Sequence, residues 1–152
     1  MADVEVTETI AAAPERVYAL VSDLPRMGEW SPENTGGSWR KGATGAAVGA
    51  KFRGTNRSGW RFWSTMVTVT GAEPGRRFAF DVDYAGVAIS TWEFDLAADG
   101  DGCSVTERWT DRRPRWMRIG SIPIMGVRDR AAHNRANMQE TLRRLKAGAE
   151  SS

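Results

Sequence analysis

The chain has 152 residues, a mass of 16.7 kDa and a formal net charge of +2, and its 41% hydrophobic content is typical of one globular domain with a real core. One His and one Cys are too few for a zinc site of such ligands, and no Gly-x-Ser-x-Gly elbow, dinucleotide fingerprint or phosphate loop occurs. No apolar run is long enough for a membrane span or a signal segment, and Cys103 has no partner for a disulfide, so we expect a reduced, cytoplasmic setting.

The N-terminal quarter predicts one strand and two short helical stretches. Apolar and polar residues alternate from Val4 to Ala11, which indicates a half-buried strand. Pro14 is suited to a first helical turn, and the apolar spacing that follows predicts a helix from Pro14 to Ser22. After Pro25 we expect one further helical turn, from Arg26 to Trp30.

Six strands are expected next. One short strand lies around Trp39, and the others are Val48–Asn56, Arg61–Gly71, Arg76–Tyr84, Ala88–Ala97 and Cys103–Asp111. Short loops rich in Gly, Pro, Asp and Ser separate them. Loops of this length favour antiparallel neighbours, so the pattern predicts a meander.

The last element is a long helix, predicted from Ile124 to Lys146, with Gly148 placed to end it. Its apolar stripe includes Asn134 and Met138. We therefore expect a single domain over residues 1–148 and a short tail over 149–152. A sheet with one apolar face and a helix with one apolar stripe must pack together.

Strand alternation also predicts which side chains face inward. If Cys103 and Val105 point to the interior, so do Glu107 and Trp109. A buried carboxyl needs a hydrogen bond or a raised pKa, and Asn56, Tyr84 and Asn134 are candidate partners for Glu107. The opposite register would turn Glu107 toward an Arg at the surface, and a slip of one residue decides between the two.

The chain holds seven Trp, of which Trp63, Trp92 and Trp109 are expected on inward faces, where they could stack on a flat ligand. Trp30 and Trp116 could guard an entrance, and aromatic walls suit flat guests, although aromatic residues also simply fill cores. His133 is expected in an exposed or capping role and Cys103 in packing. The candidate ligand-binding residues are Trp30, Phe52, Asn56, Trp63, Phe80, Tyr84, Trp92, Glu107, Trp109, Asn134 and Met138.

Charge is unevenly distributed. Residues 108–146 hold eleven of the 21 Lys and Arg but only three of the 19 acidic residues. This basic C-terminal third could attract nucleic acid or an anionic membrane surface, and the segment from Arg112 to Arg118 is its most notable part. A solvated basic face explains the same pattern, and we regard nucleic acid as the weaker reading.

The chain resembles the SRPBCC helix-grip superfamily, which includes START lipid-transfer domains, birch-pollen-type allergens and aromatase/cyclases. It is most similar to the bacterial polyketide cyclase/dehydrase branch. The resemblance runs from Val4 to Lys146. It is carried by residues 12–18, Leu24 to Pro32, Phe52-Arg53-Gly54 with Asn56-Arg57, Pro74 to Phe78, Trp92-Glu93-Phe94, and the helix from Asp129 with His133-Asn134 and Thr141-Leu142.

The resemblance implies an α+β fold in which a seven-stranded antiparallel sheet wraps around the C-terminal helix and encloses a cavity for apolar ligands. Two functions follow as hypotheses: binding of a small hydrophobic or aromatic, lipid- or polyketide-like molecule, or a cofactor-free cyclase/dehydratase reaction. For the reaction, Glu107, Tyr84 and Asn56 are the candidate catalytic residues, with Arg53 as a possible oxyanion donor. No metal is expected, and we expect a monomer or weak homodimer. A third and weaker hypothesis is a regulatory protein that binds a partner through the segment from Arg112 to Arg118.

Overall fold

The computed structural model describes residues 2–58, 60–116 and 130–151. In chain order the elements are β1 (Val4–Ile10), α1 (Pro14–Val21), the 3-10 helix η1 (Leu24–Glu29), β2 (Asn34–Arg40), β3 (Lys51–Ser58), β4 (Arg61–Glu73), β5 (Arg77–Tyr84), β6 (Val87–Asp99), β7 (Gly102–Asp111) and α3 (Arg130–Glu150). Within the described ranges, no helix has the length and apolar character needed to cross a membrane.

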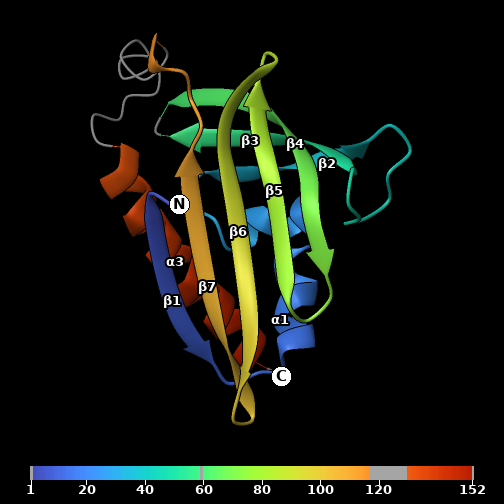
Figure 1. Ribbon diagram of the computed structural model, residues 1–152, viewed down its shortest axis with the longest axis vertical. Coiled ribbons are helices and arrows are strands. Elements are labelled where there is room, and N and C mark those ends of the chain that lie inside the picture. Colours follow the sequence, from blue (N-terminus) through green and yellow to red (C-terminus); the bar gives the residue numbers. More distant parts are fainter. Residues whose placement is uncertain (1, 59, 117–129, 152) are drawn as a thin grey trace.

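The seven strands form one antiparallel sheet in the order β1-β7-β6-β5-β4-β3-β2. From β2 to β7 each strand pairs with the next, which confirms the predicted meander. β1 closes the sheet by pairing with β7, so the two ends of the strand sequence lie side by side. Figure 1 shows the sheet bending, with β2 and β3 running across the direction of β6. A register shift between Val69 and Gly71 in β4 increases this bend, as bulges do.

The α3 helix lies on the concave side of the sheet, with α1 against its C-terminal half (Figure 1). Together these elements give the helix-grip architecture that the sequence predicted. Ile10, Val17, Phe78 and Leu145 are completely buried and join β1, α1, β5 and α3 in one core. Burial of this shared apolar surface is what holds helix and sheet together.

The C-terminal end differs from the expectation. The helix continues past Gly148 to Glu150, and Ala149 is only 4% exposed. Gly148 therefore does not end the helix, and residues 149 and 150 belong to it rather than to a tail. Gly148 has a packing role instead, because a Cβ there would lie 2.7 Å from Cζ3 of Trp30. The predicted first turn of this helix, residues 124–129, lies outside the described residues.

Candidate functional site

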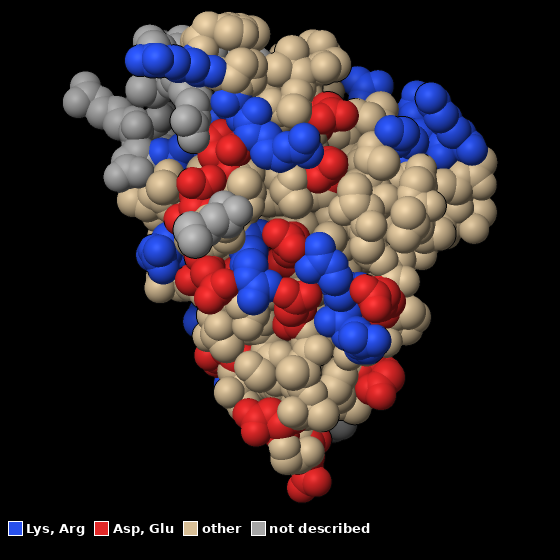
Figure 2. All heavy atoms as spheres, viewed as in Figure 1, with Lys and Arg blue, Asp and Glu red and all other residues tan. Residues whose placement is uncertain are grey.

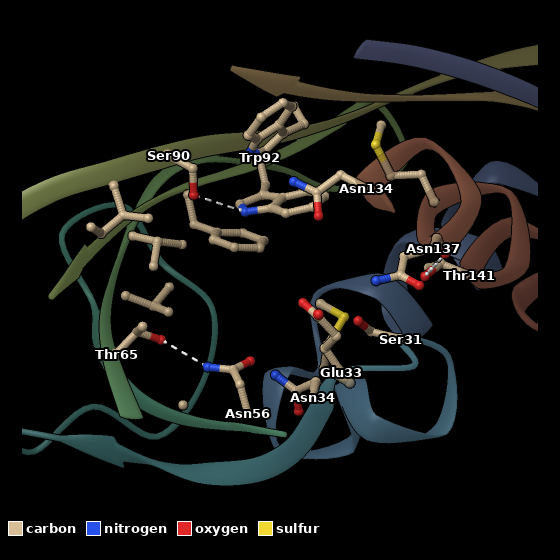
Figure 3. Close-up of a pocket in the computed structure, with 18 of the residues that line it drawn as sticks. Ser31, Glu33, Asn34, Asn56, Thr65, Ser90, Trp92, Asn134, Asn137 and Thr141 are labelled. Atoms are coloured by element: carbon tan, nitrogen blue, oxygen red, sulfur yellow. Dashed lines mark hydrogen bonds between the residues drawn. The ribbon is translucent and has the colours of Figure 1, made fainter. Parts of the chain in front are cut away.

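A cavity of about 130 Å³ lies between the concave face of the sheet, the first half of α3 and the segment from η1 to β2 (Figure 3). Ten of the eleven residues predicted to bind a ligand line it. They are Phe52, Asn56, Trp63, Phe80, Tyr84, Trp92, Glu107, Trp109, Asn134 and Met138.

The wall of the cavity is built by strand alternation in register. Phe80 of β5 stands opposite Trp92 of β6, and Trp92 stands opposite Trp109 of β7, so three aromatic side chains form a row across the sheet. The rings of Trp92 and Trp109 have centroids 6.5 Å apart. Trp92 Nε1 donates a hydrogen bond of 3.1 Å to Ser90 Oγ, which fixes the indole and satisfies its N–H. This row is a surface suited to a flat apolar guest.

Glu107 faces the interior, which confirms the first of the two registers. Its neighbours in the sheet are Phe94 on β6 and Val6 on β1. The residue is 3% exposed, and its Oε1 has no hydrogen-bond partner among the described residues. Burial raises its pKa well above the ordinary value of 4.5, because the charged form loses its hydration. The protonated carboxyl is therefore favoured, and it has an O–H to donate.

Asn134 is another buried polar group of the cavity lining. It lies on α3 one turn before Met138 and is 2% exposed. Figure 3 shows Asn134 and Asn137 pointing from α3 into the cavity. An amide that faces a cavity can donate a hydrogen bond to a guest or accept one from it.

The expected partners of Glu107 lie elsewhere. Asn56 donates from Nδ2 to Thr65 Oγ1 at 3.3 Å, across β3 and β4. Tyr84 stands at the end of β5, partly exposed, at the open side of the cavity. Neither of these, nor Asn134, bonds to Glu107 Oε1. Packing therefore holds the Glu107 carboxyl in place, and no described residue forms a hydrogen bond with its Oε1.

A charged cluster at the rim was not predicted from the sequence. Glu33 accepts hydrogen bonds from Arg130 Nη2 at 2.7 Å and lies 2.8 Å from His133 Nε2. Its backbone oxygen accepts from the N–H of Arg57 at 2.7 Å, which extends the pairing of β2 with β3 and places the carboxylate over the start of α3. Residues 97 and 100 positions apart meet here, and no local periodicity indicates such a contact. His133 is therefore part of an ion-pair cluster.

Three further predictions concern aromatic and basic residues. Trp30 does not lie at the entrance: it is buried against Gly148, away from the cavity lining. Trp116 is exposed. In the basic segment, Arg112 pairs with Asp81 at 3.0 Å and Arg113 with Asp111 at 2.8 Å, so part of its charge is neutralised within the protein. Arg118 lies outside the described residues.

Cys103 is completely buried, and burial raises the pKa of its thiol, as fits a packing residue. Within residues 2–58, 60–116 and 130–151, no group of three His, Cys, Asp or Glu side chains is arranged to hold a metal ion.

The chain is similar to known proteins in both sequence and fold. The family model described as polyketide cyclase / dehydrase and lipid transport matches residues 1–150. A polyketide-cyclase-like protein from Corynebacterium glutamicum is 33% identical and superposes with a TM-score of 0.63 over 94% of this chain and 88% of its own. A search of curated protein sequences gave no match.

Two more distant structures share the fold. A di-domain aromatase/cyclase from the steffimycin biosynthetic pathway is 16% identical, with a TM-score of 0.70 over 97% of this chain, which spans 50% of that one. A major latex-like protein from Panax ginseng is 11% identical, with a TM-score of 0.71 over 97% of this chain and 96% of its own.

Proposed function

The chain belongs to the polyketide cyclase/dehydrase and lipid-transport family, and from this premise we propose that it binds a small aromatic molecule that carries a hydroxyl or carbonyl group. One observation carries the proposal: Glu107 Oε1 is buried in an aromatic cavity without a hydrogen-bond partner among the described residues, and the amide of Asn134 points into the same cavity. A protonated carboxyl can donate to a carbonyl oxygen, and an amide can donate or accept. A guest with one polar group at its edge satisfies both.

The size of the cavity limits the guest. Its volume of about 130 Å³ is close to the roughly 150 Å³ of an engineered apolar cavity that takes up benzene. One aromatic ring therefore fits without rearrangement, while a polycyclic molecule requires side chains such as Trp63 to move. We expect phenols and aryl ketones with a single ring to bind more tightly than larger relatives of equal hydrophobicity.

The test is a titration with acetophenone and phenol, followed by the quenching of tryptophan fluorescence, since Trp92 and Trp109 line the cavity. Glu107→Leu and Asn134→Leu each remove one polar anchor and should weaken binding by about tenfold, the cost of one lost hydrogen bond of ordinary strength. Thr106→Val, on the outer face of the same strand as Glu107, is the matched control and should bind like the unaltered protein. Absence of saturable binding at millimolar ligand would refute the proposal.

A second candidate function is supported by Glu107 itself. A neutral acid in an aromatic cavity can donate a proton to a ketone oxygen, which assists enolisation, aldol closure and loss of water from a poly-ketone chain. Tyr84 and Asn56 line the same cavity and supply further polar groups. Incubation with a reactive linear polyketide tests this: specific cyclisation that disappears in Glu107→Gln supports an enzyme. Products no different from those of the spontaneous reaction leave binding as the function.

A further inference from the structure

The antiparallel register places one set of exposed aromatic side chains at a single end of the sheet. Ser58 at the end of β3 pairs with Arg61 at the start of β4. Met66 of β4 pairs with Asp83 near the end of β5. Ser90 of β6 pairs with Asp111 at the end of β7. The β3–β4 hairpin, the β5–β6 turn and the segment after β7 therefore lie together. Figure 1 shows these elements at the same end of the molecule.

The lining of the cavity extends to this end. Asn56, Trp63, Tyr84 and Arg113 line the cavity from these same strand ends. Trp60 lies three residues before Trp63, so the hairpin carries it about 10 Å beyond the cavity wall at 3.3 Å per residue. We call the surface formed by Arg57, Trp60, Phe62, Tyr84, Arg115 and Trp116 the mouth surface.

The exposure of its aromatic side chains is unusual. Trp60 is 78% exposed, Phe62 70% and Trp116 67%, whereas large apolar side chains are normally covered. Among the described residues, only three other large apolar side chains are exposed, and one of these is Tyr84 of the same surface. Trp and Tyr are the residues that favour the interface between water and lipid.

The basic side chains of the mouth surface favour a negatively charged partner. Arg57 lies over the Phe62 ring, with its guanidinium carbon 5.2 Å from the centroid, and Arg115 stands exposed next to Trp116. Glu33, Asp81 and Asp111 at this end are each paired with an Arg, and Asp3 and Asp83 lie at the same end.

The opposite end of the sheet is acidic. The β6–β7 turn there carries exposed Asp99 and Asp101. Figure 2 shows blue and red side chains mixed toward the end that carries the β5–β6 turn, and red ones without blue at the opposite tip. This uneven distribution of charge orients the protein with its mouth surface toward a negatively charged partner surface.

We propose that the mouth surface docks on an anionic lipid bilayer, with Trp60, Phe62 and Trp116 in the interface and Arg57 and Arg115 at the headgroups. Amphipathic aromatic groups combined with basic residues are the pattern that binds peripheral proteins to such surfaces. In this position the cavity opens onto the bilayer, so an apolar guest passes between lipid and protein with little exposure to water. The exchange role rests on the proposed function, whereas the docking itself does not.

The experiment is sedimentation of the full chain with vesicles of phosphatidylcholine alone or with about 30 mol% phosphatidylglycerol, near physiological salt. We expect binding to the anionic vesicles, a blue shift of tryptophan emission, and quenching by brominated acyl chains. The double variant Trp60→Ser/Phe62→Ser should lower the apparent affinity by about tenfold, in line with removal of two interfacial aromatic anchors. Val48→Ser is the matched control: Val48 is 69% exposed but precedes β3, away from the hairpin, and its loss should change nothing.

Three results would overturn the docking proposal: no binding to anionic vesicles, equal binding by the double variant with an unchanged circular dichroism spectrum, or an equal loss in Val48→Ser. Retention on polyglutamate without vesicle binding would point instead to an acidic protein as partner and would also overturn it. The acetophenone titration keeps the two proposals separate, because the double variant leaves Glu107 and Asn134 intact and should bind that soluble ligand normally.

Discussion

Glu107 of β7 stands directly opposite Phe94 of β6, so a carboxyl group shares the inner face of the sheet with a ring that is almost completely buried. The sheet has no freedom to turn Glu107 outward, because the same register buries Val105 and Trp109 on either side of it. The carboxyl therefore keeps its proton to a higher pH than in water.

This arrangement predicts that Glu107→Gln stabilises the protein, increasingly so as the pH rises. The folded-state pKa lies well above 4.5, so between these two values the native protein binds more protons than the unfolded chain. Stability is full below the unfolded pKa and falls as the pH rises toward the folded pKa, by at most about 1.4 kcal/mol per pH unit. Gln cannot ionise, so the free energy of unfolding of the variant does not fall with pH for this reason. Urea unfolding at pH 5, 6, 7 and 8 measures the difference.

The matched control is Glu93→Gln, which removes a carboxylate on the outer face of β6 that pairs with Arg77 at 2.8 Å. It should give no gain that increases with pH. A constant difference between Glu107→Gln and the unaltered protein at all four pH values would contradict the assignment of Glu107 as a buried, protonated group.

A second prediction concerns the contact between Trp30 and α3. Gly148→Ala places a methyl group 2.7 Å from Cζ3 and 3.1 Å from Cη2 of the Trp30 ring, so the ring or the helix must shift. Overpacking costs about 1–3 kcal/mol, and only up to about 1 kcal/mol returns from the better helix propensity of Ala. We expect a net loss in the free energy of unfolding. Adding Trp30→Leu should recover most of it, and a stabilised single variant would contradict the packing.

The rim cluster leads to a third prediction. Glu33→Gln removes the carboxylate that holds Arg130 and His133, and leaves a largely buried guanidinium without its charge partner. We expect the free energy of unfolding to fall by about 1.5–3 kcal/mol, the range for hydrogen bonds to charged groups. Amide exchange should accelerate in residues 31–34 and in the first turn of α3. Equal acceleration of amide exchange in the β1–β7 pair would mean that the whole protein loses stability, and not only the contact between Glu33 and the start of α3.

A fourth prediction tests the size limit of the cavity. Trp63→Leu removes most of an indole from the cavity lining. The enlarged cavity should shift the ratio of the Kd values of 2-naphthol and phenol by about tenfold in favour of the bicyclic ligand, since two to three extra methylene-sized groups become buried. Val48→Leu serves as the surface control. An unchanged ratio would show that Trp63 does not limit the guest.

Much of the fold follows from local pattern. Alternation in the last strand narrowed its inner face to two registers, and the turn residues between strands predicted antiparallel neighbours. Ten of the eleven candidate site residues line the cavity for the same reason, since inward-facing positions of a curved sheet must meet the helix that covers them. Trp30 is the exception, because a residue in an irregular segment has no periodicity that indicates its direction.

The sequence by itself determined that this chain forms a meander and a long helix with one aromatic face between them, because periods of two and of about 3.6 residues are local properties. Only the tertiary structure decided that Glu107 points inward, that its Oε1 lacks a hydrogen-bond partner among the described residues, and that Asn134 faces the same cavity. It also joined Glu33 to Arg130 and His133. These relationships depend on register and on contacts across about a hundred residues, which only the packing of helix on sheet fixes.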